Sequence, residues 1–576
     1  MAGALRHEQQ LGAWLGCERW RPIDGVSMRG TQFTCFTGTK LQVLTQTAPR
    51  YQIRANQVGV VSRGAKSSIT LRLCRANENA CVGVGIREGG KGLCEGCEMK
   101  GNHYGVCSFN ANASVRLLKC DASGNHRYGV SASDGAAVEA IECRLNKNLQ
   151  LGMGAWDANS RVTLVSCTSN DNGRHGVYAR GGCTITMQGC EVRNNKQFGV
   201  YVCGQGSKIG MSQCESIDNG LYGVGASEQG LAEMSLTRAL RNLQAGVVAK
   251  DAGSRIILRD CNASDNGRIG LVAIVGGLIE ATECAMRHND KVGLGAWHKD
   301  SKLTVLRCEV CDNGASGITA IESGLVLAHS CLIKGNANVG AVAKGLGSKI
   351  LLDNCIASLN GRFGVGAKGK GRIEAVACSM VHNTQSGVAA KDSGSALSLT
   401  RCCLSDNGKY GVSVRECGAV EMEECDVTSN GQMSLCIWHE GSTVMVDRCV
   451  MTHTSTCPMS IRRDAVGHRL DSSAPATHAR CATTTAADSD NGHLSKVRDQ
   501  SSASSTYSWG CSVTPPVFAT TPDIVPPTPS STWGYLTDTV SSPTPVDSSD
   551  ARKQMQKNSA APLSPSRSCC VVSVLF

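Results

Sequence analysis

Proline is nearly absent from most of this chain. Its 576 residues contain 14 prolines, and only Pro22 and Pro49 come before Cys449. The other prolines crowd into the last part of the chain, among many serines and threonines. This distribution argues against several domains joined by proline-rich linkers, and it separates one long Gly-rich body from a tail.

The same composition gives the expected domain boundaries. We expect an N-terminal cap segment at 1–50, a repeat body at 51–455 and a Ser/Thr/Pro-rich tail at 456–576. The tail has few large apolar residues, so burial cannot offset the entropy of ordering it, and the sequence predicts that it is disordered.

Aromatic residues, dense positive runs and long apolar runs are scarce as well. Aromatics make up 4% of the chain, and the net charge of +10 comes from dispersed Lys and Arg. Nucleic-acid-binding surfaces usually combine a dense basic stripe with aromatic side chains, so we expect no nucleic-acid partner. No stretch is long and apolar enough to predict a membrane span.

The first residues also lack the features of a targeting signal. Met1–Arg21 has no apolar run after a basic segment, so no signal peptide is predicted. Without such a segment, 32 cysteines indicate reduced thiols rather than a disulfide framework. We therefore expect an intracellular, cytoplasmic protein.

Cysteine is abundant, and its spacing is regular. The steps are 23 or 24 residues, and the one double step, from Cys214 to Cys261, has Thr237 in the empty place. A fixed period of this length marks a repeat architecture. Because cysteine is small and usually buried, the column is expected to fill a core. Its members are Cys74, Cys97, Cys120, Cys143, Cys167, Cys190, Cys214, Cys261, Cys284, Cys308, Cys331, Cys355, Cys378, Cys402, Cys425 and Cys449.

Other residues repeat in register with this cysteine, which we number position 0 of each unit. Asn stands at +5 and Gly at +9 in most units, as in Asn172 and Gly176. Apolar pairs stand at +10 and +12, at −5 and −3, and at 0 and +2. A spacing of two is the period of a strand, and no segment has helical spacing. The unit is therefore predicted to be one coil of an all-β parallel β-helix, with three short strands and about 17 coils in all. A leucine-rich repeat, the main rival, needs a helical segment per unit that is missing here.

The asparagine column predicts a ladder of side-chain amides inside a turn, each bonded to the next. In alternate coils this Asn is followed by Gly, as in Asn172-Gly173. Such Asn-Gly pairs are expected to supply the positive φ that a tight turn needs.

The residues that would carry catalysis or hold a metal do not cluster. Acids align at +4 in alternate coils (Asp171, Asp218, Asp265, Asp312 and Asp406), about 9.6 Å apart at strand spacing. That separation is too long for shared calcium ligation, and a row of equivalent acids lacks the two different environments of an acid/base pair. Cys308 and Cys311 have no second pair at zinc-binding spacing. We expect no catalytic residue, no metal and no cofactor.

The best candidate for function is a surface beside the +9 glycines. Positions +9 and +11 are often Gly, Ala or Ser and are expected to point outward, leaving a bare strip of backbone. Outward Trp and Lys at +13 flank this strip and could stack sugar rings or grip an extended anionic chain. The tryptophans recur 141 residues apart, a sign of internal duplication. The predicted binding residues are Trp156, Trp297, Trp438, Lys250, Lys344, Lys391, His298, His439, Asp157 and Asp300.

Cys167 through Ala179 resembles the repeat of the right-handed parallel β-helix family, which has the pectin-lyase-like fold. The resemblance extends over about residues 50–450. It implies a right-handed solenoid, and it leaves function open, because this fold carries polysaccharide lyases, hydrolases, epimerases, surface proteins and adaptors.

Two functions remain open from the sequence. The leading hypothesis is a non-enzymatic scaffold that binds an extended partner, protein or glycan, along the Gly-rich face. The alternative is a carbohydrate-active enzyme of the pectin-lyase-like group, with a site that the sequence does not identify. The sequence does not predict an oligomeric state.

Overall fold

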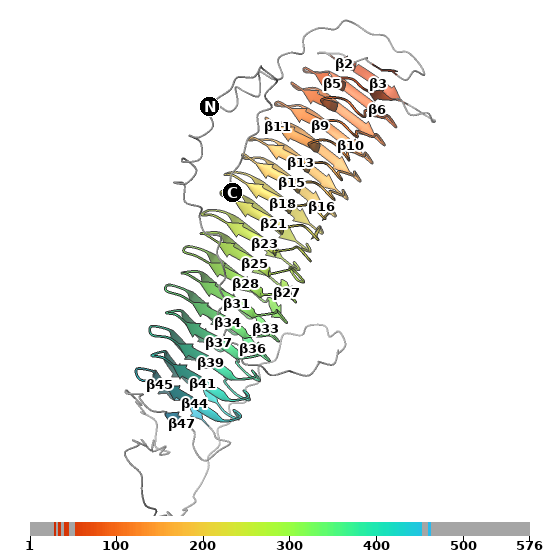
Figure 1. The fold of residues 1–576 in the computed structure, drawn as a ribbon. Helices are drawn as coiled ribbons and strands as arrows, with labels where there is room; N and C mark the ends of the chain where they lie inside the picture. The colour runs from red at the N-terminus through yellow and green to blue at the C-terminus, as the bar shows by residue number, and fades with distance from the viewer. Residues whose placement is uncertain (1–27, 30–32, 36–39, 45–51, 452–458, 462–576) are drawn as a thin grey trace, which may run out of the picture. The chain divides into compact units, whose positions relative to one another are not determined.

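The computed structural model describes residues 28–29, 33–35, 40–44, 52–451 and 459–461. These residues form strands and turns, and no helix occurs among them. The strands stack as the coils of a right-handed parallel β-solenoid, so the predicted fold class is confirmed (Figure 1). Most of the predicted tail and of the predicted cap segment lies outside the described residues.

Each coil contributes one strand to each of two long parallel sheets. Sheet 1 holds the longer strands, which contain the Gly-Val motif. Its strands are β2 Phe33–Cys35, β5 Val58–Arg63, β7 Val82–Arg87, β9 Tyr104–Phe109, β11 Tyr128–Ser133, β13 Leu151–Trp156, β15 His175–Arg180, β18 Phe198–Cys203, β21 Tyr222–Ser227, β23 Ala245–Lys250, β25 Ile269–Ile274, β28 Val292–Trp297, β31 Ser316–Ile321, β34 Val339–Lys344, β37 Phe363–Lys368, β39 Ser386–Lys391, β41 Tyr410–Arg415, β44 Met433–Trp438 and β47 Met459–Ile461.

Sheet 2 holds the strands that precede each cysteine. They are β3 Lys40–Leu44, β6 Ser68–Arg72, β8 Lys91–Glu95, β10 Ser114–Leu118, β12 Ala137–Ile141, β14 Arg161–Val165, β16 Thr184–Gln188, β19 Lys208–Ser212, β22 Leu231–Ser235, β24 Arg255–Arg259, β26 Leu278–Thr282, β29 Lys302–Leu306, β32 Leu325–His329, β35 Lys349–Asp353, β38 Arg372–Val376, β40 Ala396–Thr400, β42 Ala419–Glu423 and β45 Thr443–Asp447.

The third face follows each cysteine and is shorter and interrupted. Several coils contribute only a single parallel bridge there, as between Arg75 and Glu98. Its strands are β1 Met28–Arg29, β4 Ile53–Arg54, β17 Glu191–Arg193, β20 Glu215–Ile217, β27 Ala285–Arg287, β30 Glu309–Cys311, β33 Leu332–Lys334, β36 Ile356–Ser358, β43 Asp426–Val427 and β46 Val450–Met451.

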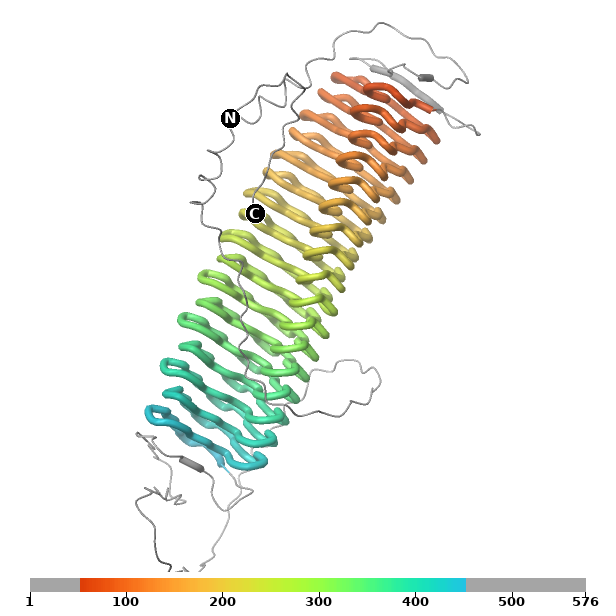
Figure 2. Tube along the Cα trace, in the orientation of Figure 1, coloured from red at the N-terminus to blue at the C-terminus, as the bar shows by residue number. Residues whose placement is uncertain are grey.

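Successive coils stay in register for the whole described length (Figure 2). In sheet 1, Val224 pairs with Val247 and Val247 with Leu271. Sheet 1 has seventeen strands from β5 to β44, hence sixteen turns, close to the predicted number of coils. The ladders also reach into the predicted cap segment, because β2 and β3 pair in parallel with β5 and β6.

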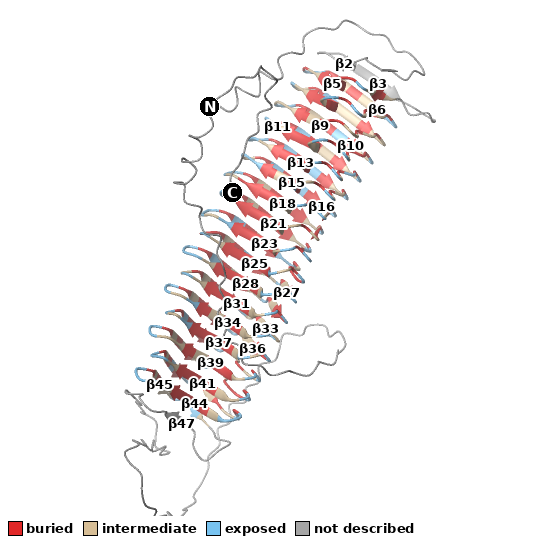
Figure 3. Ribbon diagram, in the orientation of Figure 1, coloured by how far each residue is buried: buried red, intermediate tan, exposed pale blue. Residues whose placement is uncertain are grey.

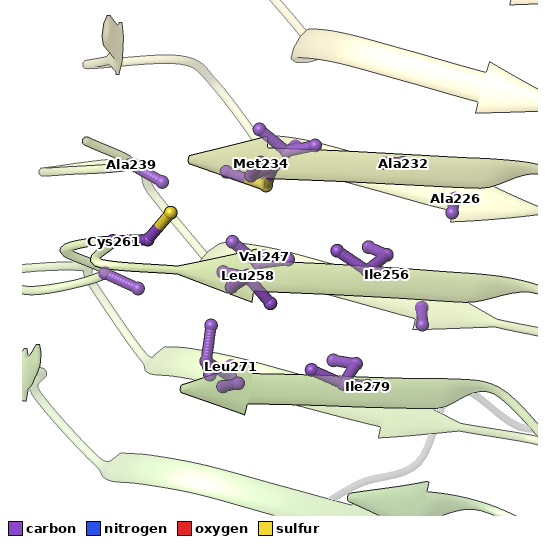
Figure 4. Close-up of a cluster of buried hydrophobic side chains, with 14 of the residues drawn as sticks. Ala226, Ala232, Met234, Ala239, Val247, Ile256, Leu258, Cys261, Leu271 and Ile279 are labelled. Carbon is purple, nitrogen blue, oxygen red and sulfur yellow. The ribbon is translucent and has the colours of Figure 1, made fainter. Parts of the chain in front are cut away.

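The predicted inward pairs form one continuous core between the three faces (Figure 3). Figure 4 shows this for one stretch, where Ile256, Leu258 and Cys261 point toward Val247. These four side chains are at most 3% exposed. Cysteine fills one column of the core, as predicted, and no disulfide joins its described members.

The predicted amide ladder is confirmed and is more complete than the sequence analysis stated. The backbone N–H and the side-chain Nδ2 of Asn172 both donate to Oδ1 of Asn195, at 3.0 and 2.9 Å. The same double donation joins neighbouring coils from Asn79 to Asn430, and Asn148 belongs to it as well. These amides are buried, so each rung satisfies polar groups that water does not reach.

The turn around this ladder differs from the prediction in one respect. The left-handed residue is the acid before the Asn, such as Asp171 (φ 58°) and Asp218 (φ 58°), and Gly173 does not have positive φ. Glycine is needed after the Asn for space, because a Cβ on Gly173 would collide with the carbonyl of Leu149 in the previous coil. The Asn-Gly prediction therefore had the right residues and the wrong reason.

Candidate functional site

Sheet 1 has an inner face that builds the core and an outer face that carries the candidate site. Positions +10 and +12 point inward, as in Val247 and Ala249, which are 0% exposed. Positions +8, +11 and +13 lie on the other side, where rings from neighbouring coils contact one another. The side chains at +8 and +13 are mostly only partly buried. The outer face can therefore vary without disturbing the core.

The expected bare strip of backbone is not present. The +9 glycine is enclosed, since a Cβ on Gly246 would lie 2.8 Å from both the amide Nδ2 of Asn266 and the carbonyl oxygen of Gly270. Aromatic rings cover +11 glycines: the ring of Trp156 lies over Gly154, and the ring of Trp297 lies over Gly295. These glycines make room for the amide ladder and for aromatic side chains, which is why the prediction of an open strip was wrong.

A continuous row of aromatic side chains occupies the outer face from β9 to β21. We call it the aromatic stripe. Ring centroids lie 5.3 Å apart for Tyr104–Tyr128, 4.9 Å for Tyr128–Trp156, 6.4 Å for Trp156–Tyr178, 5.7 Å for Tyr178–Tyr201, 4.3 Å for Tyr201–Phe198 and 5.1 Å for Phe198–Tyr222. Five of the six separations are within the range of favourable ring pairs, about 4.5–7 Å, and the Tyr201–Phe198 pair lies just below it. At strand spacing the stripe crosses five intervals, about 24 Å along the solenoid.

One histidine is buried within this stripe. His175 is 4% exposed and lies 5.5 Å from the ring of Tyr178 and 5.2 Å from that of Phe198. Its Nδ1 accepts a hydrogen bond from the backbone N–H of Phe198 at 3.4 Å. Burial, with a smaller effect of the Arg174 charge, lowers the pKa of His175 to about 3. The imidazole is therefore neutral and acts as another aromatic ring of the surface.

The tyrosines of the stripe are set in similarly dry surroundings. Burial raises the pKa of Tyr104 and of Tyr201 to about 12. The hydroxyls nevertheless have partners, with Tyr104 bonded to Arg127 at 2.7 Å and Tyr201 to Ser227 at 2.6 Å. The rings are thus fixed in place, which keeps the entropic penalty of a contact with another molecule low.

An aliphatic patch continues the stripe toward the C-terminus. Ala245, Val248, Ile269 and Val272 form a buried cluster separate from the core, and they are 1–6% exposed. Partly buried side chains pack around them: Phe198, Tyr222, Ile274, Val292 and Trp297. Since Phe198 and Tyr222 also belong to the aromatic stripe, the two apolar regions are continuous.

Beyond this patch the outer face becomes positively charged. Lys344, Lys368, Lys391 and Arg415 occupy the +13 position of consecutive strands and are directly paired in register. We call them the cationic column. Lys391 contacts Glu416 at 3.2 Å, and the guanidinium of Arg415 lies 3.2 Å from the ring centroid of Trp438. Burial lowers the pKa of Arg415.

The structure places the predicted binding residues along one edge of sheet 1 and does not bring them together. Trp156, Trp297 and Trp438 each end a strand and lie six coils apart, about 29 Å at strand spacing. They stand in different surroundings: Trp156 in the aromatic stripe, Trp297 in the aliphatic patch and Trp438 beside Arg415. The indole N–H of Trp297 donates to Oγ1 of Thr319 at 2.9 Å.

The remaining predicted residues are distributed in the same way. Lys250 and Lys344 are exposed, and Lys391 is partly buried. His298, His439, Asp157 and Asp300 are exposed in the turns after these strands, all with positive φ. His298 lies 3.5 Å from Glu322, and Nδ1 of His439 accepts the backbone N–H of Glu416 at 3.3 Å. The four turn residues therefore serve the turns and do not form a pocket.

Sequence reasoning missed most of the aromatic stripe and half of the cationic column. Tyr104, Tyr128, Tyr178, Phe198, Tyr201 and Tyr222 were not singled out, and neither were Lys368 and Arg415. The available signal was the column itself: reading +8, +11 and +13 down successive coils places these residues in contact. The residues predicted at +13 come from every second coil, so Lys368 and Arg415, in the coils between them, were missed.

The acid row does not form an acid/base site. Cations or histidine stand between its members, with Arg241 2.9 Å from Asp218 and His288 3.7 and 3.9 Å from Asp265 and Asp312. These ion pairs lie on the surface of the turn. Within the described ranges no three His, Cys, Asp or Glu side chains come together as metal ligands would. Nor does this part of the chain contain a helix long and apolar enough to cross a membrane.

Similarity to solved structures is distant. The structure of the Vag8–C1 inhibitor complex is 12% identical, covers 77% of this chain and 100% of that chain, and has a TM-score of 0.42. The periplasmic alginate epimerase AlgG is 13% identical, with coverage of 64% and 77% and a TM-score of 0.30. For the A-module of the mannuronan C-5 epimerase AlgE4 of Azotobacter vinelandii the identity is 12%, the coverage 66% and 91%, and the TM-score 0.31.

No curated protein matches the chain. The family described as right handed beta helix region matches residues 151–310 and 298–451. These matches together span more than half of the chain and coincide with coils that the structure shows in register. The chain therefore belongs to the right-handed β-helix family.

Proposed function

We propose that this protein is a non-enzymatic recognition scaffold that binds an extended partner, protein or glycan, along the outer face of sheet 1. The observation that carries the proposal is the aromatic stripe. Seven rings and the buried His175 form an unbroken row on an outer face, and most of the rings stay partly exposed. Core packing does not require them, because the core is complete on the inner side.

Physical chemistry supports binding at such a surface. Contiguous apolar patches on a soluble protein mark sites of interaction more often than chance exposure does. Tyr and Trp contribute large contact area together with polar groups for hydrogen bonds. The stripe and the aliphatic patch run across consecutive strands, so the matching partner is itself extended.

The arrangement of acids supports a scaffold rather than an enzyme. General acid/base catalysis needs two groups whose surroundings push their pKa values apart. The acids in the row at +4 stand in equivalent turns and are interleaved with Arg241 and His288. We see no pair among them with the asymmetry that such catalysis needs.

The free thiols of the core fit a reducing compartment, so the proposal includes a cytoplasmic location. Fractionation of cells expressing the tagged full-length chain tests that part. Recovery with secreted proteins, with the core thiols oxidised, would contradict it.

Replacing the stripe tests the function itself. In the full chain, Tyr128, Trp156 and Tyr178 are changed to Ser, a residue already present on this face at Ser316 and Ser413. A matched control changes the partly exposed Leu231, Leu278 and Leu325 of sheet 2 to Ser. Circular dichroism and thermal melting confirm that each variant is folded.

Two measurements then report binding. Isothermal titration with a panel of neutral and acidic polysaccharides detects glycans, with parallel assays for reducing and unsaturated products. Photo-cross-linking from benzoylphenylalanine at position 178, or at 278 in sheet 2, detects protein partners. We expect saturable binding or cross-linking that the stripe variant loses and the sheet 2 variant keeps. Equal behaviour of the two variants would refute the proposal, and release of products would favour the enzyme alternative.

A further inference from the structure

The cationic column differs from the other charged rows of this solenoid. Lys344, Lys368, Lys391 and Arg415 are register neighbours on β34, β37, β39 and β41. Four positive charges thus stand one strand apart, about 4.8 Å between backbones. Like charges directly opposite each other on adjacent strands destabilise a sheet.

Elsewhere in residues 52–451 two cations meet in register only as isolated pairs, Arg63 with Arg87 and Lys349 with Arg372. On sheet 2, cations pair with acids of the next coil: Arg116 with Glu139 at 3.3 Å, Arg255 with Glu280 at 2.8 Å and Lys349 with Glu374 at 2.7 Å. The same geometry on sheet 1 would allow such pairing, as Arg63 shows with Glu88 at 2.9 Å. The column differs in its length, because its four cations follow one another in register, whereas the other like-charge neighbours among the ladders of residues 52–451 are single pairs.

Of the acids beside the column in residues 52–451, only Glu416 forms an ion pair with one of its cations, Lys391. Glu322 contacts His298, and Oδ2 of Asp392 accepts the backbone N–H of Gly369 at 3.1 Å. The turn positions after Lys344 and Lys368 are Gly345 and Gly369 rather than acids. Across residues 52–451 no carboxylate lies within ion-pair distance of either lysine, and both side chains are exposed.

The side chains beside the column indicate what kind of anion fits. Val339 and Val342 on β34 and Phe363 on β37 lie on the same outer face and are partly exposed. Ile321 precedes Lys344 in the same column and leads back to Trp297 and the aliphatic patch. A sugar polymer needs polar groups for its hydroxyls beside any aromatic platform. Aliphatic neighbours next to cations suit a peptide with both acidic and apolar side chains.

We propose that the cationic column binds an extended acidic peptide segment, rich in Asp or Glu, of a partner protein whose apolar part lies on the partly exposed side chains around the aliphatic patch. The inference rests on the proposed function and selects protein over glycan as the partner. The four cations span three strand intervals, about 14 Å, which four to five residues of an extended peptide cover. Lys side chains are flexible, so their ammonium groups can follow carboxylates on such a segment.

The test uses fluorescence anisotropy with the full chain and a fluorescein-labelled hexaglutamate peptide. We expect saturable binding that weakens about tenfold or more when Lys344, Lys368 and Lys391 are all changed to Gln, since three ammonium groups that can pair with the peptide carboxylates are lost. The control changes three exposed lysines off this face, Lys91, Lys147 and Lys302, to Gln and alters the net charge equally. That control is expected to retain binding within about twofold, and raising the salt concentration is expected to weaken wild-type binding.

Several outcomes would overturn the inference. Equal loss in the two triple variants would show a general effect of net charge, and no loss in the column variant would exclude this site. Binding of a galacturonic acid hexamer in place of hexaglutamate would assign the column to a glycan.

The stripe variant separates this inference from the proposed function. It is expected to bind hexaglutamate as the wild type does, because it leaves the column intact. Absence of hexaglutamate binding, with stripe-dependent cross-linking preserved, would remove the acidic-peptide site and leave the scaffold function standing.

Discussion

The outer face of sheet 1 carries different kinds of side chain at its two ends. From β9 to β21 the outer face of sheet 1 is a row of touching rings, and from β34 to β41 it carries a row of like charges. Both rows stand on strands of equal length that pair in register. The inward side chains of these strands belong to the same core. The backbone therefore constrains the inward positions and leaves the outward ones to differ, so function in this protein is to be sought in the outward columns.

The difference also has an energetic side. Rings in contact stabilise the sheet that carries them, whereas like charges in register oppose it. The aromatic end thus adds to the stability of the sheet, and the cationic end lowers it.

The largest expected effect tests what the two ends share. Asn172→Ala and Asn383→Ala each remove an Oδ1 that accepts a backbone N–H and a side-chain amide from the previous coil. Leaving these buried donors unpaired is expected to lower the free energy of unfolding by about 3 kcal/mol at either end. Urea denaturation followed by circular dichroism measures this, with the partly exposed Asn338→Ala as control. Clearly unequal losses would show that the ends differ in their cores as well.

The next effect concerns the enclosed glycine at +9. A methyl group in Gly246→Ala meets the Asn266 amide and the Gly270 carbonyl oxygen, both at 2.8 Å, and is expected to destabilise by about 2 kcal/mol. Gly210→Ala on sheet 2 is the matched control, since nothing lies within 4 Å of its added Cβ. We expect no loss there, measured as the midpoint of thermal unfolding. An unchanged unfolding midpoint for Gly246→Ala would contradict the enclosed glycine and support an open strip of backbone.

A third prediction applies only to the aromatic end and concerns pH. Burial holds the pKa of His175 at about 3, below its unfolded value of about 6.5. The unfolded state therefore binds the proton first, and stability is lost as the pH falls from about 6.5 toward 3. Between pH 7 and 5.5 the wild type is expected to lose about 1 kcal/mol more than His175→Phe. Parallel urea titrations at both pH values measure the difference, and identical pH profiles would contradict a buried neutral histidine.

The smallest effect applies only to the cationic end. Lys344→Gln combined with Lys368→Gln removes like-charge repulsion and is expected to stabilise by a few tenths of a kcal/mol at low salt. Arg255→Gln, which breaks the pair with Glu280, is expected to destabilise by a similar amount. Both shifts should shrink in high salt. Thermal melting at two salt concentrations checks the opposite signs, and equal signs would remove the contrast with sheet 2.

Much of the fold could be predicted because the same residue pattern recurs in every coil, so the assignment of one coil applies to the others. The period located the cysteine column, and the pairs spaced by two gave the inward residues, such as Val162 and Leu164, which are 2% and 1% exposed. The amide ladder was predicted for the same reason. Turn conformation was harder, because Asp171 rather than Gly173 takes the left-handed φ, and that choice depends on contact with the previous coil.

The sequence by itself determined the coil, its three strands and the side of each strand that builds the core, because these follow from local spacing repeated many times. Only the tertiary structure decided which outward side chains touch. Tyr128 and Trp156 are 28 residues apart and differ in position within the coil, yet their rings lie 4.9 Å apart because stacking brings +8 of one coil against +13 of the next. Contacts of this kind depend on side-chain rotamers as well as on register, and the repeat in the sequence gives the register only.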